Sequence, residues 1–282
     1  MTKILPRSGE VPDILRWEPP TWEHFLGNQR LKRHLKKLVK RMRGQLRLTG
    51  HVPDVNRLCF LVTGGSRTGK TALIKHTIRC LSCQELDEET LNPCNRTCHV
   101  CRQRPETLGL QGLFSSVELD DERLNLNFSI VDCTKIHTPE QLREHLISTT
   151  SWMEGLRINY FDEVHRLVHR GMDEMLLKEV EDKNFLWIFS TAKPQDLEDM
   201  FLNRLIKLKT ELPEPAEMEL WLADRCEEWG IRWEPEAILR VVEKSNCVVG
   251  TALHALALAS LDPDEGLTSD LVENDWVVKL DE

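Results

Sequence analysis

The chain has 282 residues, of which 40% are hydrophobic and 29% are charged, and its formal net charge is −9. This length suits about two domains built around a real apolar core. The chain has no long uncharged apolar run and its first residues contain no signal-like apolar segment, which argues against a membrane span and a secretory signal. We therefore expect a cytoplasmic protein with no membrane partner.

The first predicted helix is strongly basic. Residues 29–49 contain nine Lys or Arg and no Asp or Glu, although the whole chain is acidic. Apolar residues recur in this stretch at helical spacing, which predicts one buried and one basic face; they are Leu31, Leu35, Leu38, Val39, Met42 and Leu46. Two interpretations of the basic face remain open at this point, contact with nucleic acid and simple solvation.

A glycine-rich loop follows the next predicted strand. An apolar run at 58–62 precedes the motif Gly64-x-x-x-x-Gly-Lys-Thr71, and an apolar helical pattern continues over 72–81. In this context the glycines allow backbone N–H groups to surround a phosphate, and the helix N-terminus adds positive charge. We expect Lys70 to reach the β- and γ-phosphates and the Thr71 hydroxyl to bind Mg²⁺. The pattern predicts nucleotide binding.

Five of the nine cysteines gather between residues 80 and 101. Disulfides are rare in a reducing compartment, whereas short Cys-x-x-Cys-like spacings suit a tetrahedral zinc site. We predict an insertion at 83–104 in which zinc is held by Cys83, Cys94, Cys98 and Cys101. Cys80 lies inside the predicted helix and is the reserve ligand. Because ligation by four thiolates leaves no open position, the zinc would be structural.

Strands and helices alternate beyond the cysteines. The patterns predict strands at 128–132, 157–161 and 185–189, with helices from about Pro139 and at 172–180. This alternation predicts a parallel sheet that is covered on both faces and binds its ligand at the carboxyl ends of its strands.

An acidic pair, Asp162 and Glu163, follows the strand at 157–161. A carboxylate at a strand end that faces a phosphate loop is suited to hold Mg²⁺, and the next carboxylate is suited to polarise the attacking water. We assign the first role to Asp162 and the second to Glu163.

Helices dominate the remainder of the chain. Prolines in Leu212-Pro-Glu-Pro215 mark a boundary, and helices are predicted at 215–229, 234–245 and 250–261. The last segment, 268–280, is compatible with a short helix or a strand. The predicted divisions are an amino-terminal arm with the basic helix at 1–49, a nucleotide-binding domain at 50–211, a helical lid domain at 212–265 and a short tail at 266–282.

Several motifs along residues 15–260 resemble those of the clamp-loader AAA+ ATPases. Besides the phosphate loop they are Trp17-Glu-Pro-Pro-Thr-Trp-Glu-His-Phe-Leu-Gly27, Asp162-Glu-Val-His-Arg-Leu, Phe189-Ser-Thr-Ala-Lys-Pro-Gln-Asp-Leu197 and Leu202-Asn-Arg204. The chain resembles the gamma/tau subunit of bacterial DNA polymerase III, which carries a similar zinc module, and the small subunits of replication factor C. The resemblance implies an α/β fold, a P-loop AAA+ parallel-sheet domain with a zinc-binding insertion, followed by a small helical lid domain.

The resemblance also implies roles for particular residues. ATP would contact the amino-terminal box and the phosphate loop through Trp17, Pro19, Leu26, Gly27, Gly64, Gly65, Ser66, Arg67, Thr68, Gly69, Lys70, Thr71 and Ala72. Thr71 and Asp162 would hold Mg²⁺, and the implied catalytic residues are Lys70, Asp162, Glu163, Thr191 and Arg204. Arg204 matches an arginine finger that acts on the nucleotide of a neighbouring subunit, which implies an oligomer of the same or related AAA+ subunits.

Three positions depart from the resemblance. Ala192 stands where a polar residue that orients water is expected, with Thr191 beside it. Leu253 occupies the position of a nucleotide-sensing arginine, and Glu18 replaces an arginine of the amino-terminal box. Members of the resembled family continue into a helical collar that holds their subunits together, and the sequence up to Glu282 has no counterpart of it. Two alternatives remain open, a truncated chain and assembly through a different surface.

Three functions fit these observations. The leading hypothesis is an ATP-binding and ATP-hydrolysing subunit of a clamp-loader-like complex that acts on DNA and loads a sliding clamp. The second is a stator subunit that holds nucleotide, supplies Arg204 to its neighbour and hydrolyses little. The third is a non-replicative AAA+ ATPase of a mobile element or defence system.

Overall fold

A six-stranded sheet forms the centre of the protein. The computed structural model describes residues 13–49, 58–102, 115–118, 125–150, 156–180, 185–262 and 264–276. The strands are β1 (Cys59–Thr63), β2 (Ser115–Glu118), β3 (Asn125–Asp132), β4 (Leu156–Asp162), β5 (Phe185–Thr191) and β6 (Ile206–Lys209). Their order across the sheet is β2-β3-β4-β5-β1-β6, and every neighbouring pair is parallel except β2 and β3. The predicted parallel α/β sheet is confirmed, and β2 adds an antiparallel edge that the sequence patterns did not reveal.

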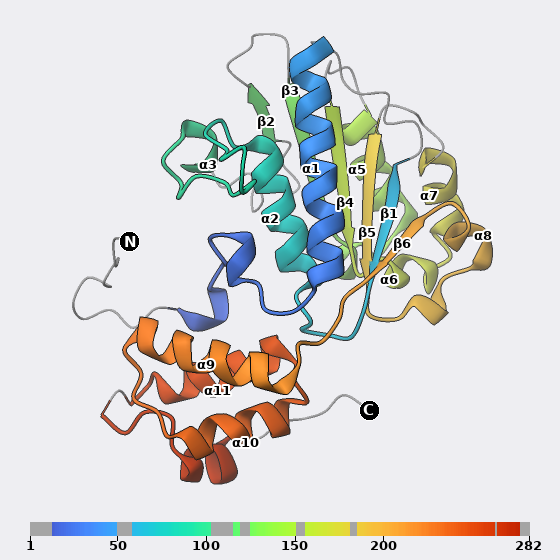
Figure 1. The fold of residues 1–282 in the computed structure, drawn as a ribbon. Helices are drawn as coiled ribbons and strands as arrows, with labels where there is room; N and C mark the ends of the chain where they lie inside the picture. Colours follow the sequence, from blue (N-terminus) through green and yellow to red (C-terminus); the bar gives the residue numbers. More distant parts are fainter. Residues whose placement is uncertain are drawn as a thin grey trace.

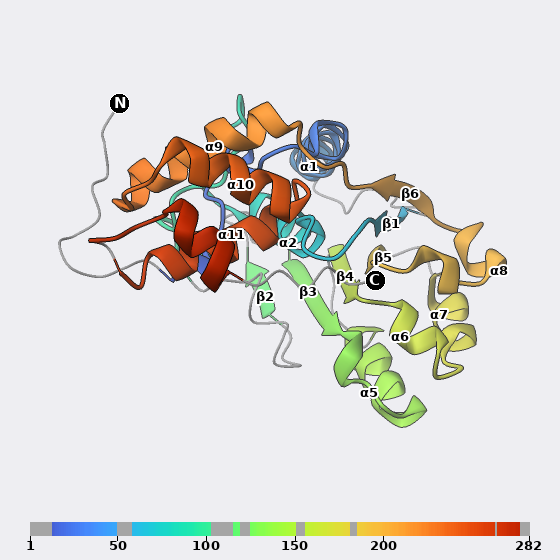
Figure 2. The same cartoon turned by 90° about the horizontal axis from the view of Figure 1, so that it is seen from below.

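Helices cover both faces of this sheet, as Figures 1 and 2 show from two directions. On one face lie α1 (Gln29–Thr49) and α2 (Lys70–Ser82), and on the other lie α5 (Pro139–Thr150), α6 (His165–Val168), α7 (Asp173–Val180) and α8 (Asp199–Leu202). Alternate residues of β5 serve the two faces, with Leu186 and Ile188 in one core and Trp187 and Phe189 in the other. This period of two within the apolar run 185–189 is what a doubly covered parallel sheet requires.

Helix α1 buries the apolar face that its sequence predicts, since Leu31, Leu35, Leu38, Val39 and Met42 are all buried. The side chain of Leu46 lies outside the part described. Some of the basic residues of α1 make contacts within the protein. Lys32 is buried and its Nζ donates to the Phe25 carbonyl at 2.8 Å, and Lys36 lies 3.3 Å from a Glu23 carboxylate oxygen.

A second, helical domain follows β6. Its helices are α9 (Pro215–Trp229), α10 (Pro235–Ser245) and α11 (Val249–Ala259). Prolines 215 and 235 occupy first-turn positions, and left-handed residues Gly230 and Asn246 end α9 and α10. Leu267, Leu271, Val272 and Trp276 pack into the same core as the three helices, and the segment at Leu271–Asp275 forms a single helical turn.

The amino-terminal arm, defined as residues 13–28, joins the parts of the molecule. Ile14 lies in the core of the helical domain, whereas Trp22 and Phe25 lie in the core beneath α1 and α2. Trp17 packs against Trp221 of α9, with ring centroids 5.9 Å apart. In Figure 1 the arm runs between the helical domain and the cysteine-containing loop beside α2.

Some predicted segments lie outside the described residues, namely 1–12 of the arm, 50–57 before β1, 103–104 of the cysteine insertion and 277–282 of the tail. Within the described part of the chain, no helix is long and apolar enough to cross a membrane.

Candidate nucleotide-binding site

The phosphate loop joins β1 to α2, in the strand–loop–helix context that its motif requires. Gly64 has φ +147°, and a Cβ at this position would lie 1.8 Å from Thr210 Oγ1. Gly69 has φ +91° immediately before α2 begins at Lys70. Both glycines therefore occupy places where a side chain would strain or block the loop. Thr68 ties the loop to the end of β6 through a 2.8 Å contact between its Oγ1 and Thr210 Oγ1.

Lys70 is buried inside the curve of this loop. Its Nζ donates to the carbonyls of Gly64 at 2.9 Å and Gly65 at 2.8 Å. Burial lowers the pKa of the Lys70 ammonium, and the carboxylates of Glu163 and Asp162 oppose that shift. A buried cation at the junction of a glycine-rich loop and a helix N-terminus is suited to receive the oxygens of a polyphosphate.

The structure brings the two predicted magnesium ligands together. Thr71 Oγ1 donates to Asp162 Oδ2 at 2.9 Å, and Ser190 donates to the other oxygen of Asp162. The Tyr160 hydroxyl lies 3.0 Å from Ser190 Oγ and supports it from within the core. A hydroxyl and an oriented carboxylate offer the oxygen ligands that Mg²⁺ prefers.

Glu163 is held by the end of β5 and by a histidine. Its Oε2 accepts a 3.2 Å hydrogen bond from the Ala192 N–H and lies 3.2 Å from His165 Nδ1. The same His165 nitrogen lies 3.0 Å from Thr191 Oγ1. Glu163 has φ +54°, a left-handed conformation that costs about 1–2 kcal/mol in a non-glycine residue and is common at functional sites.

His165 thus connects two predicted catalytic residues, Glu163 and Thr191, although sequence reasoning did not identify it. It is 3% exposed, and burial lowers its pKa while the Glu163 carboxylate opposes that shift. A neutral imidazole is therefore favoured. Its position two residues after Glu163, at the start of α6, was the one signal for this role in the sequence.

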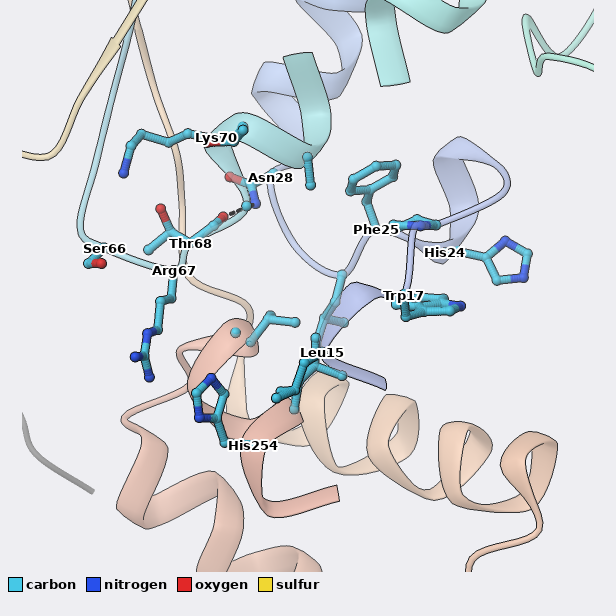
Figure 3. Close-up of a pocket in the computed structure, with 18 of the residues that line it drawn as sticks. Leu15, Trp17, His24, Phe25, Asn28, Ser66, Arg67, Thr68, Lys70 and His254 are labelled. Atoms are coloured by element: carbon cyan, nitrogen blue, oxygen red, sulfur yellow. Dashed lines mark hydrogen bonds between the residues drawn. The ribbon is translucent and has the colours of Figure 1, made fainter. Parts of the chain in front are cut away.

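A cavity of about 450 Å³ opens beside the phosphate loop, which is within the range of about 300–1,000 Å³ of small-molecule sites. The loop and Glu163 form one end, and Figure 3 shows the arm and α11 forming the other. This second end is mostly apolar and is lined by Leu15, Trp17, Pro19, Phe25, Leu26, Trp221 and Leu253. The combination of a polar end and an apolar end suits a nucleotide, whose phosphates and base require different surroundings.

Many of the predicted site residues line this cavity; they are Trp17, Pro19, Leu26, Ser66, Arg67, Thr68, Gly69, Lys70, Thr71, Ala72 and Glu163. Gly64 and Gly65 shape the loop behind Lys70, and Asp162 is in contact with Thr71. Gly27 and Thr191 are not among the residues that line the cavity. The structure does not bring Arg204 to the cavity, because it is exposed after α8 and donates to the Met200 carbonyl at 2.7 Å.

Other lining residues come from outside the recognised motifs. Asn28 Nδ2 donates to the Thr68 carbonyl at 3.2 Å, and Asn28 Oδ1 accepts from the Glu211 N–H at 2.8 Å. Gly250 at the start of α11 donates its N–H to the Arg67 carbonyl at 3.1 Å. A Cβ on Gly250 would lie 2.7 Å from Arg67 Cβ, so glycine permits this contact. The helical domain therefore touches the phosphate loop directly.

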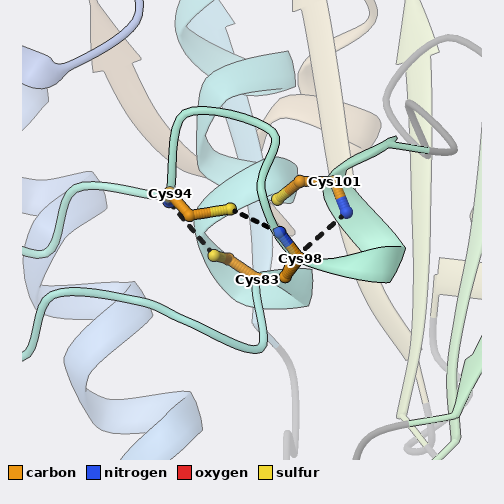
Figure 4. A group of neighbouring side chains, drawn as sticks. All are labelled: Cys83, Cys94, Cys98 and Cys101. Atoms are coloured by element: carbon orange, nitrogen blue, oxygen red, sulfur yellow. Dashed lines mark hydrogen bonds between the residues drawn. The ribbon is translucent and has the colours of Figure 1, made fainter.

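The four predicted zinc ligands form a compact cluster (Figure 4). The Sγ atoms of Cys83, Cys94, Cys98 and Cys101 all lie within 4.8 Å of one another. Backbone N–H groups donate to three of the sulfurs, at 3.2 Å for Cys83, 3.4 Å for Cys94 and 3.3 Å for Cys98. Tetrahedral zinc with bonds of about 2.3 Å would place its sulfurs about 3.8 Å apart, which this cluster accommodates. Cys80, the reserve ligand, is buried in α2 and is not part of the cluster.

Comparison with known proteins reveals the fold. No protein-family model and no curated protein matches the sequence. Among solved structures, a single-residue variant of RuvB from Thermotoga maritima aligns at 15% identity and a TM-score of 0.54, covering 92% of this chain and 71% of RuvB. The structure described as the RuvB Holliday junction branch migration motor of the same organism aligns at 14% identity and a TM-score of 0.51, with the same coverage. The chain therefore has an α/β fold similar to that of RuvB.

Proposed function

We propose that this protein binds a magnesium complex of ATP in the 450 Å³ cavity and hydrolyses it. The observation that carries the proposal is the meeting of three elements at one end of that cavity. These are Lys70 in the phosphate loop, the Thr71–Asp162 pair and the carboxylate of Glu163. The aromatic and aliphatic side chains at the other end favour a nucleotide over inorganic phosphate.

Each residue has a defined task in this proposal. Lys70 binds the β- and γ-phosphates, and Thr71 and Asp162 hold Mg²⁺, which neutralises charge on the phosphate oxygens. Glu163 orients the attacking water, and His165 and Thr191 fix the position of Glu163. The α11 contact with Arg67 supports a role for the helical domain as a lid. We further propose that Arg204 acts on the nucleotide of a neighbouring AAA+ subunit, since it is exposed away from its own cavity.

A stator that binds ATP without rapid turnover is the second candidate. It is favoured by Leu253, an apolar side chain that lines the cavity where the resemblance implies a sensing arginine. It is also favoured by Ala192, which offers only its backbone N–H to Glu163.

Measurement of ATP turnover in the wild type and in Glu163→Gln distinguishes the two candidates. The hydrolase proposal predicts an active wild type and a Glu163→Gln variant that binds ATP but turns over at least about 100-fold more slowly. Glu174→Gln, an exposed acid on α7, is the matched control and should retain full activity. Equal, negligible turnover with retained binding would support the stator, and no ATP binding by any variant would contradict both.

We propose DNA as the macromolecular partner, within a clamp-loader-like complex that places a sliding clamp. The support is the exposed basic face of α1, which carries Arg30, Arg33, Lys37, Lys40 and Arg41. The structural neighbour RuvB is itself described as a Holliday junction branch migration motor.

Charge reversal on α1 tests the DNA proposal. A Lys37→Glu, Lys40→Glu, Arg41→Glu variant should bind DNA at least about tenfold more weakly and show a shallower salt dependence, because each lost phosphate contact removes about one unit of slope. Reversal of Arg166 and Lys178, exposed on the opposite face of the sheet, should leave binding unchanged. Equal DNA affinity in all three proteins would contradict the proposal.

We also propose that the four-cysteine cluster holds a structural zinc ion. One equivalent of zinc in the purified protein, lost in a Cys98→Ser, Cys101→Ser variant and retained in Cys80→Ser, is the expected result.

A further inference from the structure

The cysteine module, defined as residues 83–102, is joined to the arm by hydrogen bonds. Trp22 Nε1 donates to the Leu91 carbonyl at 2.7 Å, and the Trp22 N–H donates to Asn92 Oδ1 at 2.9 Å. Asn92 Nδ2 in turn donates to Glu23 Oε2 at 2.9 Å. Trp22 is 1% exposed, so its indole N–H depends on the Leu91 carbonyl as its hydrogen-bond partner.

A second connection links the arm to a cysteine of the cluster itself. Arg96 Nη1 donates to the Cys101 carbonyl at 3.1 Å, while Arg96 Nη2 is paired with the Glu18 carboxylate. Glu18 is the residue that departs from the resemblance, which implies an arginine at that position. Its pairing with Arg96 provides a physical reason for the departure.

The module is also held against the helices beneath it. Arg43 of α1 donates to the Cys83 carbonyl at 2.7 Å, and Arg79 of α2 donates to the Cys94 carbonyl at 2.6 Å. Helix α2 begins at the phosphate loop, so the module has a fixed position relative to the phosphate end of the cavity.

The same stretch of the arm forms the wall of the cavity. Glu18 lies between Trp17 and Pro19, which both line it, and Trp22 precedes the lining residues Phe25 and Leu26. The rings of Trp22 and Phe25 both pack against the ring of His76, at centroid distances of 4.6 and 5.1 Å. The position of the base-binding wall therefore depends on contacts with the module.

We propose that metal binding to the four cysteines positions the arm, so that zinc and nucleotide each strengthen the binding of the other. This rests on the proposed nucleotide site. The described part of the module has one short helix, α3 (His99–Arg102), and otherwise irregular backbone, so its conformation depends on the metal cross-link. Loss of the metal removes the fixed carbonyl of Leu91 and the fixed side chains of Asn92 and Arg96 from the arm. By linkage, the factor by which zinc raises nucleotide affinity equals the factor by which nucleotide raises zinc affinity.

The first experiment compares zinc-replete protein with protein stripped by a chelator, using ADP as the probe so that turnover does not interfere. Calorimetry should give an ADP affinity about tenfold or more higher for the zinc-replete form. Competition with a zinc-binding dye should show that saturating ADP tightens zinc binding by the same factor.

The second experiment keeps all four cysteines and cuts the connection. Asn92→Ala and Trp22→Phe each remove arm-to-module hydrogen bonds, and both should retain one zinc while binding ADP about three- to tenfold more weakly. In both variants, ADP should raise the affinity for zinc by a smaller factor than it does in the wild type. Asn95→Ala is the matched control, because Asn95 is an exposed asparagine of the same module.

The outcomes separate this inference from the nucleotide proposal. If the stripped protein, Asn92→Ala and Trp22→Phe all bind ADP as tightly as wild type, the inference is wrong and the nucleotide site stands. If removal of zinc unfolds the protein, the ADP affinities of Asn92→Ala and Trp22→Phe alone test the inference. If zinc-replete wild type binds no ADP, the proposed function itself is wrong.

Discussion

The two ends of the cavity are built in opposite ways. The phosphate end comes from one continuous loop, Gly64 to Thr71, and from the ends of β4 and β5, and it is organised by hydrogen bonds to Lys70 and Asp162. The base end is assembled from the arm, α9 and α11, which are far apart in the sequence, and it is organised by aromatic packing. An anion requires converging N–H groups at fixed spacing, whereas an apolar wall can be made from any segments that meet. The first kind of site is encoded by one continuous motif, whereas the recognised amino-terminal box supplies only the arm residues of the second, such as Trp17, Pro19 and Leu26.

The largest effect is expected from Gly64→Ala at the phosphate end. The new Cβ would meet Thr210 Oγ1 at 1.8 Å, so the loop must move and its N–H groups no longer converge. ATP affinity should fall at least about 100-fold, or about 2.7 kcal/mol, in calorimetry. Gly44→Ala in α1, where a Cβ meets nothing within 4 Å, should leave binding intact and raise the free energy of unfolding by about 0.5–1 kcal/mol. Similar losses in both variants would contradict this account of the loop.

A smaller, selective effect is expected from Trp17→Ala at the base end. Loss of an aromatic contact with the base, worth about 1–3 kcal/mol, should weaken ATP binding about tenfold or more. Binding of inorganic tripolyphosphate, which reaches only the phosphate end, should be unchanged. Trp17→Phe retains an aromatic ring and is the matched control. Equal weakening of both ligands by Trp17→Ala would show that the two ends are not separable.

The smallest effect concerns the buried histidine beneath the arm. Burial, with a contribution from Arg79, lowers the pKa of His76 from 6.5 to about 3. The unfolded chain therefore binds this proton more readily than the folded one, and the stabilisation present above pH 6.5 is lost as pH falls toward 3. The expected slope from this group is at most about 1.4 kcal/mol per pH unit.

Urea unfolding at several pH values between 7.5 and 5 measures this effect. His76→Phe, which keeps a ring packed against Trp22 and Phe25, should show a shallower loss of stability over that interval. Parallel curves for the two proteins would exclude His76 as a source of acid sensitivity.

The phosphate end of the cavity was more predictable from the sequence than the base end. The predicted strands at 58–62, 157–161 and 185–189 are apolar runs with clear ends, so the parallel sheet was accessible. The order of its strands, the short strand β6 and the antiparallel edge strand β2 were not predicted. Close cysteine spacing was enough to select Cys83, Cys94, Cys98 and Cys101, and the position of Cys80 inside the last turn of α2 explains why it stands apart.

The base end and the supporting contacts were not accessible in the same way. Phe25 and Trp221 look like ordinary core residues, and their meeting depends on how the arm packs between two domains. Asn28 acts through backbone groups of Thr68 and Glu211, and backbone groups carry no sequence signature.

The most direct test of the central claim is the affinity of Lys70→Ala for magnesium ATP, measured by calorimetry beside Lys75→Ala on the same helix. We predict that Lys70→Ala binds at least about 100-fold more weakly than wild type, because the phosphates lose their buried cation. Lys75→Ala should bind as wild type does. Undiminished ATP affinity in Lys70→Ala would contradict the assignment of this cavity as a nucleotide site.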